Sequence, residues 1–456
     1  METAAGRSLW WDTVPAGERP EAKPLTGDTS ADVVIVGGGF TGLWTAYYLQ
    51  QRVPDRRIMV IDAGHVAFGA SGRNGGWCSA EMPHLLVTLA RTHGPMAAMR
   101  MYRAARRTLD EIERVVREED ISCDWRRDGS LYLARTEPQR ARLLAWDDMR
   151  RRLGITELEI LDAEGARRWV DVEGVLAAGY TPHCAVIQPM RLALGVARAA
   201  ARRSVALVEH TRVLEIRPGR VVTDRGIVTA DAVVCATEGY TGRLPGHRRR
   251  VLSVYSRVIA TEPLPAAAWE RIGWRDRVTV TEGRHQYAYL QRTAGDRLVL
   301  GGRGSGYYYG SRVGDRYDRD AVVYRRLRDA LAELFPSLAG ANVTHHWGGA
   351  YGWHRDGVPS VAFDPRTGLG RVGGYGGEGV LLSNLAGRTL AALVAGDSAA
   401  ETRLPWTNRT VRRWEPEPMR FVGVRGLGAL ASRADTYEDR TNRTSRLTGV
   451  AIRTVL

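Results

Sequence analysis

Short apolar runs that recur along the chain predict buried strands. Val33–Val36, Ile58–Ile61 and Ala232–Ala236 are each four or five residues long and wholly apolar. Between these runs, Thr41–Gln51 and Arg191–Arg203 have the spacing of helices. Strands that alternate with helices in this way favour an α/β fold.

Further along the chain the pattern predicts longer strands and two more helices. Met101–Val116 repeats apolar residues at helical spacing, and Val380–Val394 is a helix that opens after a run of glycines. Val251–Thr261 alternates and reads as an antiparallel strand. Turn signals separate three short strands of a predicted meander, Val213–Ile216, Arg220–Thr223 and Gly226–Thr229. Another turn separates the two strands of a predicted hairpin, Tyr287–Arg292 and Arg297–Gly301.

The size of the chain points to more than one core. With 456 residues it is too long for one ordinary domain, so we expect two domains or one interleaved unit. No signal peptide and no apolar run long enough to span a membrane are visible. The four cysteines, Cys78, Cys123, Cys184 and Cys235, are far apart, so we expect neither disulfides nor a metal site, and a cytoplasmic protein.

The net charge of +14 comes almost entirely from arginine, because Lys23 is the single lysine. A catalytic Schiff-base lysine and a phosphate-binding Gly-Lys-Ser/Thr loop are therefore excluded. A basic protein is a candidate for nucleic-acid binding. The arginines, however, alternate with acids, as in "RRLRDALAEL", which is typical of solvated helix faces, so we expect no nucleic-acid partner.

A glycine cluster follows the first strand, in "VVIVGGGFTG". Gly37, Gly39 and Gly42 lie between a strand and a helix, with the spacing that lets a backbone approach a pyrophosphate at a helix N-terminus. Asp62 ends the second strand, 20 residues after Gly42, where a carboxylate accepts hydrogen bonds from an adenosine ribose. Together they predict an adenine dinucleotide, NAD or FAD, and disfavour NADP.

A second glycine-rich loop, "GASGRNGGW", comes soon after the second strand. It combines glycines with Ser71, Arg73 and Asn74. Such a loop can place backbone N–H groups against a second phosphate or a flat ring, which a simple NAD domain does not need at this position. A flexible surface loop is the alternative interpretation.

Motifs spread over nearly the whole chain resemble one family. They are "SADVVIVGGGFTGLWTAYYL", "FGASGRNGG", "QPMRLALGVARAA", "ADAVVCATEGYTG", "QRTAGDRLVLGGRG" and "HHWGGAYGWHRDGVPS", which is followed by "GGYGGEGVLLSNLAGRTLAALVAGD". The sequence resembles the FAD-dependent amine and amino-acid oxidoreductases typified by D-amino acid oxidase, glycine oxidase and sarcosine oxidase. Within that group it is most similar to the bacterial γ-glutamylputrescine oxidase branch.

The resemblance implies a set of residues around FAD. The ADP half would be held by Gly37, Gly39, Gly42, Asp62 and Ala63. The pyrophosphate, ribityl chain and flavin edge would follow Ser71, Gly72, Arg73, Asn74, Gly75 and Gly76. Val213 would reach the adenine, Ala236 and Thr237 would line the dinucleotide, and the flavin pyrimidine end would lie at Gly376, Gly377, Gly379 and Val380. No cysteine follows Cys235, so the C-terminal flavin linkage of some sarcosine oxidases cannot form, and we predict non-covalent FAD.

The resemblance also implies the fold and the site of reaction. An FAD-binding dinucleotide domain (30–95, 185–245 and 345–400) would be interleaved with an antiparallel-sheet substrate domain (96–184 and 246–344), with arms at 1–29 and 401–456. Tyr287, Glu378 and His354 are the candidate catalytic residues. Tyr287 and its neighbours would hold the substrate, Glu378 would face its amine or cap a helix, and His354 would act as a base.

The predicted function is oxidation of the C–N bond of an amine or amino acid. Hydride passes to FAD, the imine is hydrolysed, and oxygen or another acceptor reoxidises the cofactor. The arginine that clamps the substrate carboxylate in D-amino acid oxidase cannot be placed in "HQYAYLQRT", which disfavours a free α-amino acid. Two alternatives stay open, a flavin-dependent tRNA-modifying enzyme and a non-catalytic FAD-binding protein. We expect a monomer or a homodimer.

Overall fold

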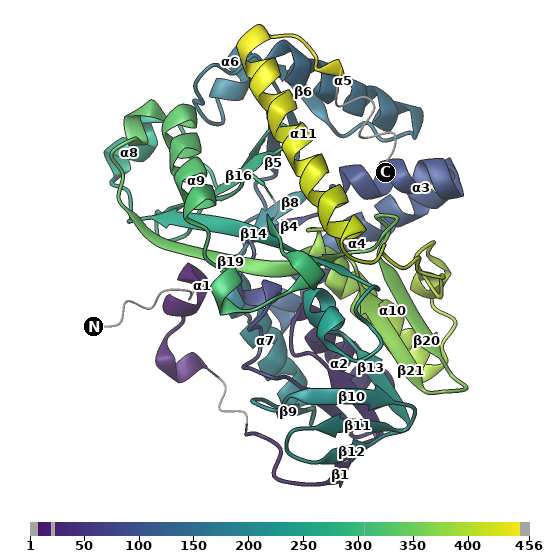
Figure 1. Cartoon of the computed structure of the whole chain (residues 1–456). Coiled ribbons are helices and arrows are strands. Elements are labelled where there is room, and N and C mark those ends of the chain that lie inside the picture. The colour runs from purple at the N-terminus through teal and green to yellow at the C-terminus, as the bar shows by residue number, and fades with distance from the viewer. Residues whose placement is uncertain (1–7, 20–22, 305, 447–456) are drawn as a thin grey trace.

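The computed structural model describes residues 8–19, 23–304 and 306–446, so the outer parts of both predicted arms lie outside the described residues. Figure 1 shows two groups of strands: one sheet system in the lower half of the view and a larger sheet above it. The chain passes between them several times. This arrangement of helices and sheets confirms the predicted mixed fold class.

The lower group is built on a six-stranded sheet. Its order is β20-β21-β13-β2-β3-β9, and all neighbours run parallel except the outer pair β20 and β21. The strands are β2 (Val33–Val36), β3 (Ile58–Ile61), β9 (Ala206–Val208), β13 (Ala232–Cys235), β20 (Ser360–Asp364) and β21 (Leu369–Gly373).

Alternate residues of this sheet face two different layers. Val33 and Ile35 pack with α2 (Phe40–Arg52), α7 (Pro189–Arg202) and α10 (Gly379–Ala395) in one hydrophobic core. Val34 and Val36 pack instead against a four-stranded sheet of order β1-β12-β11-β10. That sheet contains β1 (Thr29–Ser30), β10 (Val213–Arg217), β11 (Arg220–Thr223) and β12 (Ile227–Thr229). Since both faces of β2 are covered, its run of four apolar residues is continuous rather than alternating.

The upper group is a nine-stranded, mostly antiparallel sheet of order β18-β14-β17-β16-β15-β5-β7-β6, with β19 also paired to β14. Its strands are β5 (Ser130–Ala134), β6 (Glu159–Asp162), β7 (Ala177–Thr181), β14 (Leu252–Thr261), β15 (Thr279–Glu282), β16 (Ala288–Arg292), β17 (Leu298–Gly302), β18 (Gly306–Tyr307) and β19 (Val343–Trp353). Strands β4 (Trp77–Ser79) and β8 (Cys184–Val186) form a separate pair close to both groups.

The remaining helices surround these sheets (Figure 1). They are α1 (Leu9–Asp12), α3 (Pro83–His93), α4 (Pro95–Glu118), α5 (Glu137–Arg152), α6 (Ala163–Arg167), α8 (Ala266–Arg271), α9 (Ala321–Leu334) and α11 (Met419–Thr441), with the 3-10 helix η3 (Glu238–Arg243) after β13. Every helix and strand that the pattern predicted is present, and its ends differ by a few residues at most, except that α4 begins six residues earlier. No helix in the described ranges is long and apolar enough to cross a membrane.

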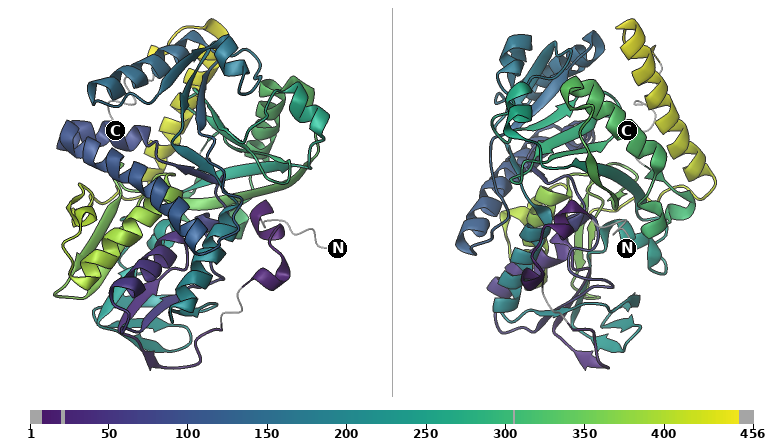
Figure 2. Two further views of the ribbon diagram at one scale, coloured as in Figure 1. Left: turned by 180° about the vertical axis from the view of Figure 1, so that it is seen from behind. Right: turned by 90° about the vertical axis from the view of Figure 1, so that its left-hand side faces the viewer.

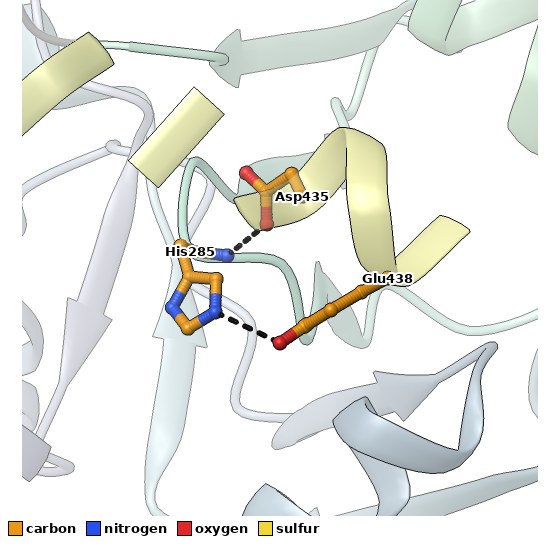
Figure 3. Close-up of side chains that lie close together, drawn as sticks. All are labelled: His285, Asp435 and Glu438. Atoms are coloured by element: carbon orange, nitrogen blue, oxygen red, sulfur yellow. Dashed lines mark hydrogen bonds and ion pairs between the residues drawn. The ribbon is translucent and has the colours of Figure 1, made fainter. Parts of the chain in front are cut away.

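The long helix α11 lies at the outer edge of the molecule (Figure 2) and is fixed by acidic side chains near its C-terminal end. Asp435 accepts hydrogen bonds from the backbone N–H groups of His285 and Gln286, at 2.8 and 2.9 Å. Glu438 pairs with Arg142 at 2.8 Å and lies 3.4 Å from His285 Nε2 (Figure 3). Because these carboxylates already have donors from the chain, we interpret the His285, Asp435 and Glu438 cluster as the anchor of α11 to the loop before β16.

The domain boundaries stay a prediction, but β19 bears on one of them. The sequence assigned residues from 345 onward to the FAD-binding domain. In the structure β19 pairs with β14 from Val343 to Trp353, inside the upper sheet. A division by sheets would therefore begin the third FAD-binding segment after β19.

Candidate active site

One large cavity lies between the two groups of sheets. Its volume is about 1050 Å³, and its lining comes from both groups. Among the predicted site residues, those that line it are Gly37, Gly39, Asp62, Ala63, Ser71, Arg73, Asn74, Gly75, Val213, Ala236, Thr237, Tyr287, Gly377, Glu378, Gly379 and Val380. The structure therefore brings together residues that are more than 340 positions apart in the sequence.

Five predicted site residues are not part of that lining. Gly42, Gly72, Gly76 and Gly376 take up positions where a side chain would collide with or crowd the protein itself. A Cβ atom on Gly42 would lie 1.9 Å from the carbonyl oxygen of Gly37, and one on Gly72 would lie 2.5 Å from that of Ala67. These four glycines allow the segments around the cavity to pack closely against one another. The fifth residue, His354, is considered below.

The glycine cluster after β2 opens the N-terminus of α2 toward the cavity. Gly37 has φ +114°, and a Cβ atom there would lie 2.5 Å from the carbonyl oxygen of Ala236 on the neighbouring strand. Gly39 is the N-cap of α2 and provides no capping side chain. Ser71 Oγ accepts from the first N–H of the helix, at Phe40. The following N–H groups of the first turn and the partial positive charge of the helix end provide the environment that a pyrophosphate requires.

Asp62 lies at the end of β3, at the edge of the cavity. Its carboxylate accepts hydrogen bonds from the backbone N–H groups of Gly38 at 2.7 Å and Gly64 at 2.8 Å. Burial raises the pKa of Asp62, and these two hydrogen bonds oppose that rise. The carboxylate is therefore held in place by the turn that it faces, with acceptor capacity left for a ribose hydroxyl.

The polar side chains of the loop at 70–76 form hydrogen bonds within the protein. They fix the shape of the loop, whose residues line the cavity. Ser71 Oγ accepts a hydrogen bond from the N–H of Phe40 at 2.8 Å. Asn74 donates to the carbonyl oxygens of Ala70 and Ser71 and accepts from the N–H of Gly76. Arg73 forms a buried ion pair with Asp318. These side chains fix the shape of the wall, whereas the sequence suggested only that they run along the cofactor.

A second helix, α10, also opens toward the cavity. Its N-cap, Glu378, makes no capping hydrogen bond. Glu238 of η3 holds the turn that precedes α10. Its buried carboxylate accepts hydrogen bonds from the N–H groups of Gly374 and Tyr375 at 2.9 and 3.1 Å. Tyr375 in turn hydrogen-bonds Thr41 of α2 at 3.0 Å. Two helix N-termini whose N-cap residues make no capping hydrogen bond face one cavity. They fit a cofactor with a pyrophosphate at one end and an electron-accepting, anion-forming ring at the other.

Aromatic side chains from the upper sheet and its loops, from β4 and from α3 line part of the cavity. They are Trp77, His84, Tyr132, Tyr287, Tyr289 and Tyr351. Tyr287 leaves 47% of its surface exposed, and Tyr289 is fixed by a 3.0 Å hydrogen bond to Ser256. Trp77 Nε1 is buried with no hydrogen-bond partner among the described residues, so it offers a donor for a bound molecule. These rings form an apolar chamber beside the N-terminus of α10.

Glu378 lies at that helix end and lines the chamber. Burial, followed by the charge of Glu81, raises the pKa of Glu378 to about 8. The charge of Glu378 in turn contributes to the raised pKa of Tyr287, which places the two groups within electrostatic reach. No described cation forms an ion pair with Glu378. A carboxyl group with a pKa near neutrality is suited to exchange a proton with a ligand.

Two further acids of the lining, Glu81 and Glu282, are already paired with arginines. Glu81 and Arg150 form an ion pair in which both side chains are at most 1% exposed, and Glu81 also accepts from Tyr102 and Thr181. Glu282 pairs with Arg303 at 2.9 Å. Since each of these arginines has a carboxylate partner, neither is a free cation for a substrate carboxylate.

His354 is placed away from the chamber. It is buried, is not part of the cavity lining, and its Nδ1 lies 3.0 Å from the carbonyl oxygen of Val358. Burial lowers its pKa to about 4. The imidazole of His354 packs against Gly374, where a Cβ atom would lie 2.5 Å from the ring. The structure therefore gives His354 a packing position rather than that of a base.

Comparison with known proteins agrees with this geometry. The profile of the FAD dependent oxidoreductase family matches residues 32–393. The chain belongs to the FAD dependent oxidoreductase family. It is 31% identical over 382 residues to γ-glutamylputrescine oxidoreductase of Escherichia coli K12, covering 82% of this chain and 86% of that protein. It is 26% identical over 405 residues to the sarcosine oxidase β subunit of an Arthrobacter species, covering 83% and 90% of the two chains.

Solved structures show the same fold. Glycine oxidase from Geobacillus kaustophilus superposes with a TM-score of 0.69 at 25% identity, covering 83% of this chain and 98% of that one. The predicted family is thus confirmed, and FAD is the cofactor that this FAD dependent oxidoreductase uses. The protein is an enzyme of the amine and amino-acid oxidoreductase class.

Several residues of the site escaped prediction. Trp77 is the last residue of the quoted motif "GASGRNGGW", so its position beside the glycine-rich loop could have marked it as a site residue. Glu238 and Tyr351 lie inside the quoted motifs "ADAVVCATEGYTG" and "HHWGGAYGWHRDGVPS" but were not singled out. Glu81 and Tyr132 lie outside every quoted motif, and their place in the site depends on contacts with distant segments. Arg150 lies in the charged helix α5, 69 residues from its partner Glu81, and looks like a surface residue in the sequence.

Proposed function

We propose that this FAD dependent oxidoreductase oxidises the C–N bond of an amine whose reacting carbon carries no carboxylate. The observation that carries the proposal is the chamber itself. It presents Glu378, which forms no ion pair with any described residue, together with tyrosine rings, and the nearby Arg150 and Arg303 are neutralised by Glu81 and Glu282. An ammonium group suits that set, because it is attracted by a carboxylate and by aromatic faces.

The arginines in the lining support the same substrate class. Arg73 is paired with Asp318. Arg212 precedes Val213, and Arg243 follows Tyr240 on η3, so both belong to the dinucleotide side of the cavity. A carboxylate on the reacting carbon would lie beside Glu378 with no free cation, and this repulsion disfavours α-amino acids.

FAD, when bound, supplies the two-electron acceptor for the α-carbon hydride of the substrate. The protein prepares the substrate for that transfer. Glu378, as a carboxylate, accepts the proton of the incoming ammonium group and leaves a neutral amine, whose lone pair can form the C=N bond. Tyr287, Tyr289 and Tyr351 hold the organic chain. Water then hydrolyses the released imine to a carbonyl compound and an amine or ammonia.

The cysteines support FAD held without a covalent bond. All four are buried, and the cavity lining contains none of them. Burial also raises the pKa of Cys78 well above its usual value, so its thiol is a poor nucleophile. The electron acceptor that reoxidises the cofactor is oxygen or another small or protein acceptor, and a reoxidation assay in air separates these.

The test uses matched pairs of compounds. Holoenzyme is mixed without oxygen with an alkylamine or N-acylated diamine and, separately, with the amino acid that carries a carboxylate on the same carbon. We expect the amine to bleach the yellow absorbance of the flavin at least tenfold faster. Faster bleaching by the amino acid overturns the substrate class, and no bleaching by any amine overturns the function.

A further inference from the structure

Outside the cofactor cavity, the loop 244–250 gathers arginines that have no acid partner. Arg248, Arg249 and Arg250 follow one another in this loop, and Arg413 lies against them. Together with Gly246 they line a hollow of about 160 Å³. A single buried water needs only about 10–15 Å³, so the hollow has room for a larger group.

No carboxylate in the described part of the chain forms an ion pair with these arginines. Glu415, two residues after Arg413, pairs instead with Arg355, and Glu417 pairs with Arg420. Arg371 adds a further positive charge from β21. Arginines without counter-charges repel one another, and burial makes that repulsion more costly.

Two polar atoms at this place are buried without partners. Arg250 Nε and His247 Nδ1 have no hydrogen bond among the described residues. Burial and the charges of Arg371 and Arg413 lower the pKa of Arg250, which is the effect of cations held together without an anion. Buried donors that lack acceptors are rare in proteins and call for a missing partner.

The loop is held in shape independently of any ligand. Trp414 N–H donates to the carbonyl oxygen of Arg249 at 2.8 Å, and Arg249 Nε donates to the carbonyl oxygen of Trp414 at 2.6 Å. Arg420 donates to the carbonyl oxygen of Arg248 at 3.3 Å. The backbone of the hollow is therefore preorganised, and Arg250 Nε is the buried guanidinium donor that has no acceptor among the described residues.

We propose that this hollow is a binding site for a phosphate group, formed by Arg248, Arg250 and Arg413. Guanidinium groups match the oxygens of a tetrahedral dianion and supply several donors each. The phosphate is either free or part of a small phosphoester. The site is distinct from the cofactor cavity, although Arg243, Leu244 and Pro245 on the same loop line that cavity.

The experiment measures thermal unfolding of the holoenzyme with inorganic phosphate, at a constant ionic strength set with chloride. We expect phosphate to raise the midpoint of unfolding in a saturable way. Arg250→Gln and Arg413→Gln should weaken the binding about tenfold or more. The control is Arg168→Gln, which removes one charge from a guanidinium that is 74% exposed at the C-cap of α6. It should leave the binding unchanged.

Three results decide the proposal. Equal stabilisation by phosphate and by chloride overturns it, and so does an equal loss of binding in the Arg168→Gln control. Stabilisation by glycerol phosphate as well as by inorganic phosphate supports a site for phosphoesters, whereas stabilisation by inorganic phosphate alone supports a site for the free ion. Arg413 is exposed, so its variant keeps the test valid if Arg250→Gln fails to fold.

Discussion

The replacement Glu378→Gln tests the role of the acid beside the tyrosine rings, which forms no ion pair with any described residue. The pKa of Glu378 is raised to about 8, so about one-tenth of the enzyme has the carboxylate at pH 7 and about half has it at pH 8. Glutamine cannot accept the ammonium proton. A positioned general base contributes about 10²–10⁴-fold to a rate, so we expect kcat/KM for the amine to fall by about 10²-fold or more at pH 8.

The pH dependence distinguishes this role from a structural one. The defect should shrink as the pH approaches the pKa of the free amine, because the substrate then arrives already neutral. The assay is anaerobic flavin reduction between pH 7 and 10, with flavin content measured for each protein. Glu164→Gln, at a side chain 81% exposed, is the control. A Glu378→Gln enzyme that keeps the wild-type rate at pH 8, or that loses the same factor at every pH, refutes the reasoning.

The same substitution has a predicted effect on stability. The unfolded chain ionises Glu378 near pH 4.5, whereas the folded protein holds the proton until about pH 8. The folded state binds more protons in that window, so its stability falls as the pH rises through it. At about 1.36 kcal/mol per pH unit the loss is at most about 4–5 kcal/mol. Glu378→Gln removes it, so the variant should gain stability over wild type at pH 8.5 but not at pH 4.

Three further substitutions test other parts of the site. Gly42→Ala should abolish FAD binding, because the new Cβ would lie 1.9 Å from a carbonyl oxygen, whereas Gly423→Ala, with nothing within 4 Å, should retain a full complement of flavin by absorbance. Arg150→Met should lower the free energy of unfolding in urea by about 3–5 kcal/mol, because it strands a buried carboxylate. Asp435→Ala should release the loop before β16 and raise KM for the amine several-fold with little change in kcat, since that loop leads to Tyr287.

Each of these has a result that contradicts it. Normal flavin content in Gly42→Ala would show that the turn after β2 can relax. Arg150→Met with wild-type stability would mean that Glu81 is protonated or solvated in the folded protein. An unchanged KM in Asp435→Ala would separate the anchor of α11 from the substrate chamber.

The parts of the fold that the sequence predicted are those with short-range causes. The four apolar residues of β2 are buried on both faces, and the glycines after it meet backbone atoms at close range, so both leave a local trace in the sequence. The same holds for the meander of β10 to β12, whose turns contain glycine. Local patterns of this kind predict single helices and strands, whereas the family resemblance predicts how these elements assemble into two interleaved domains.

The parts that escaped depend on pairing between distant residues. Arg73 lines the cavity, but nothing in the sequence indicated that it would also pair with Asp318, 245 residues away. The N-terminal segment gave no sign that Trp10 would donate to the carbonyl oxygen of Asn74 and brace the glycine loop. The sequence likewise suggested His354 as a base because it lies near Asp356, whereas Glu81 was not singled out because a buried ion pair has no motif. Such contacts are decided by tertiary packing, which periodicity does not encode.

A single-turnover measurement tests the central claim, oxidation of a C–N bond, most directly. Holoenzyme is reduced anaerobically with a limiting amine that lacks a carboxylate on its reacting carbon, and the products are quantified. We predict one equivalent of carbonyl compound and one of released amine or ammonia for each FAD reduced. Reduction of FAD without a carbonyl product, or with cleavage of a bond other than C–N, would contradict the account.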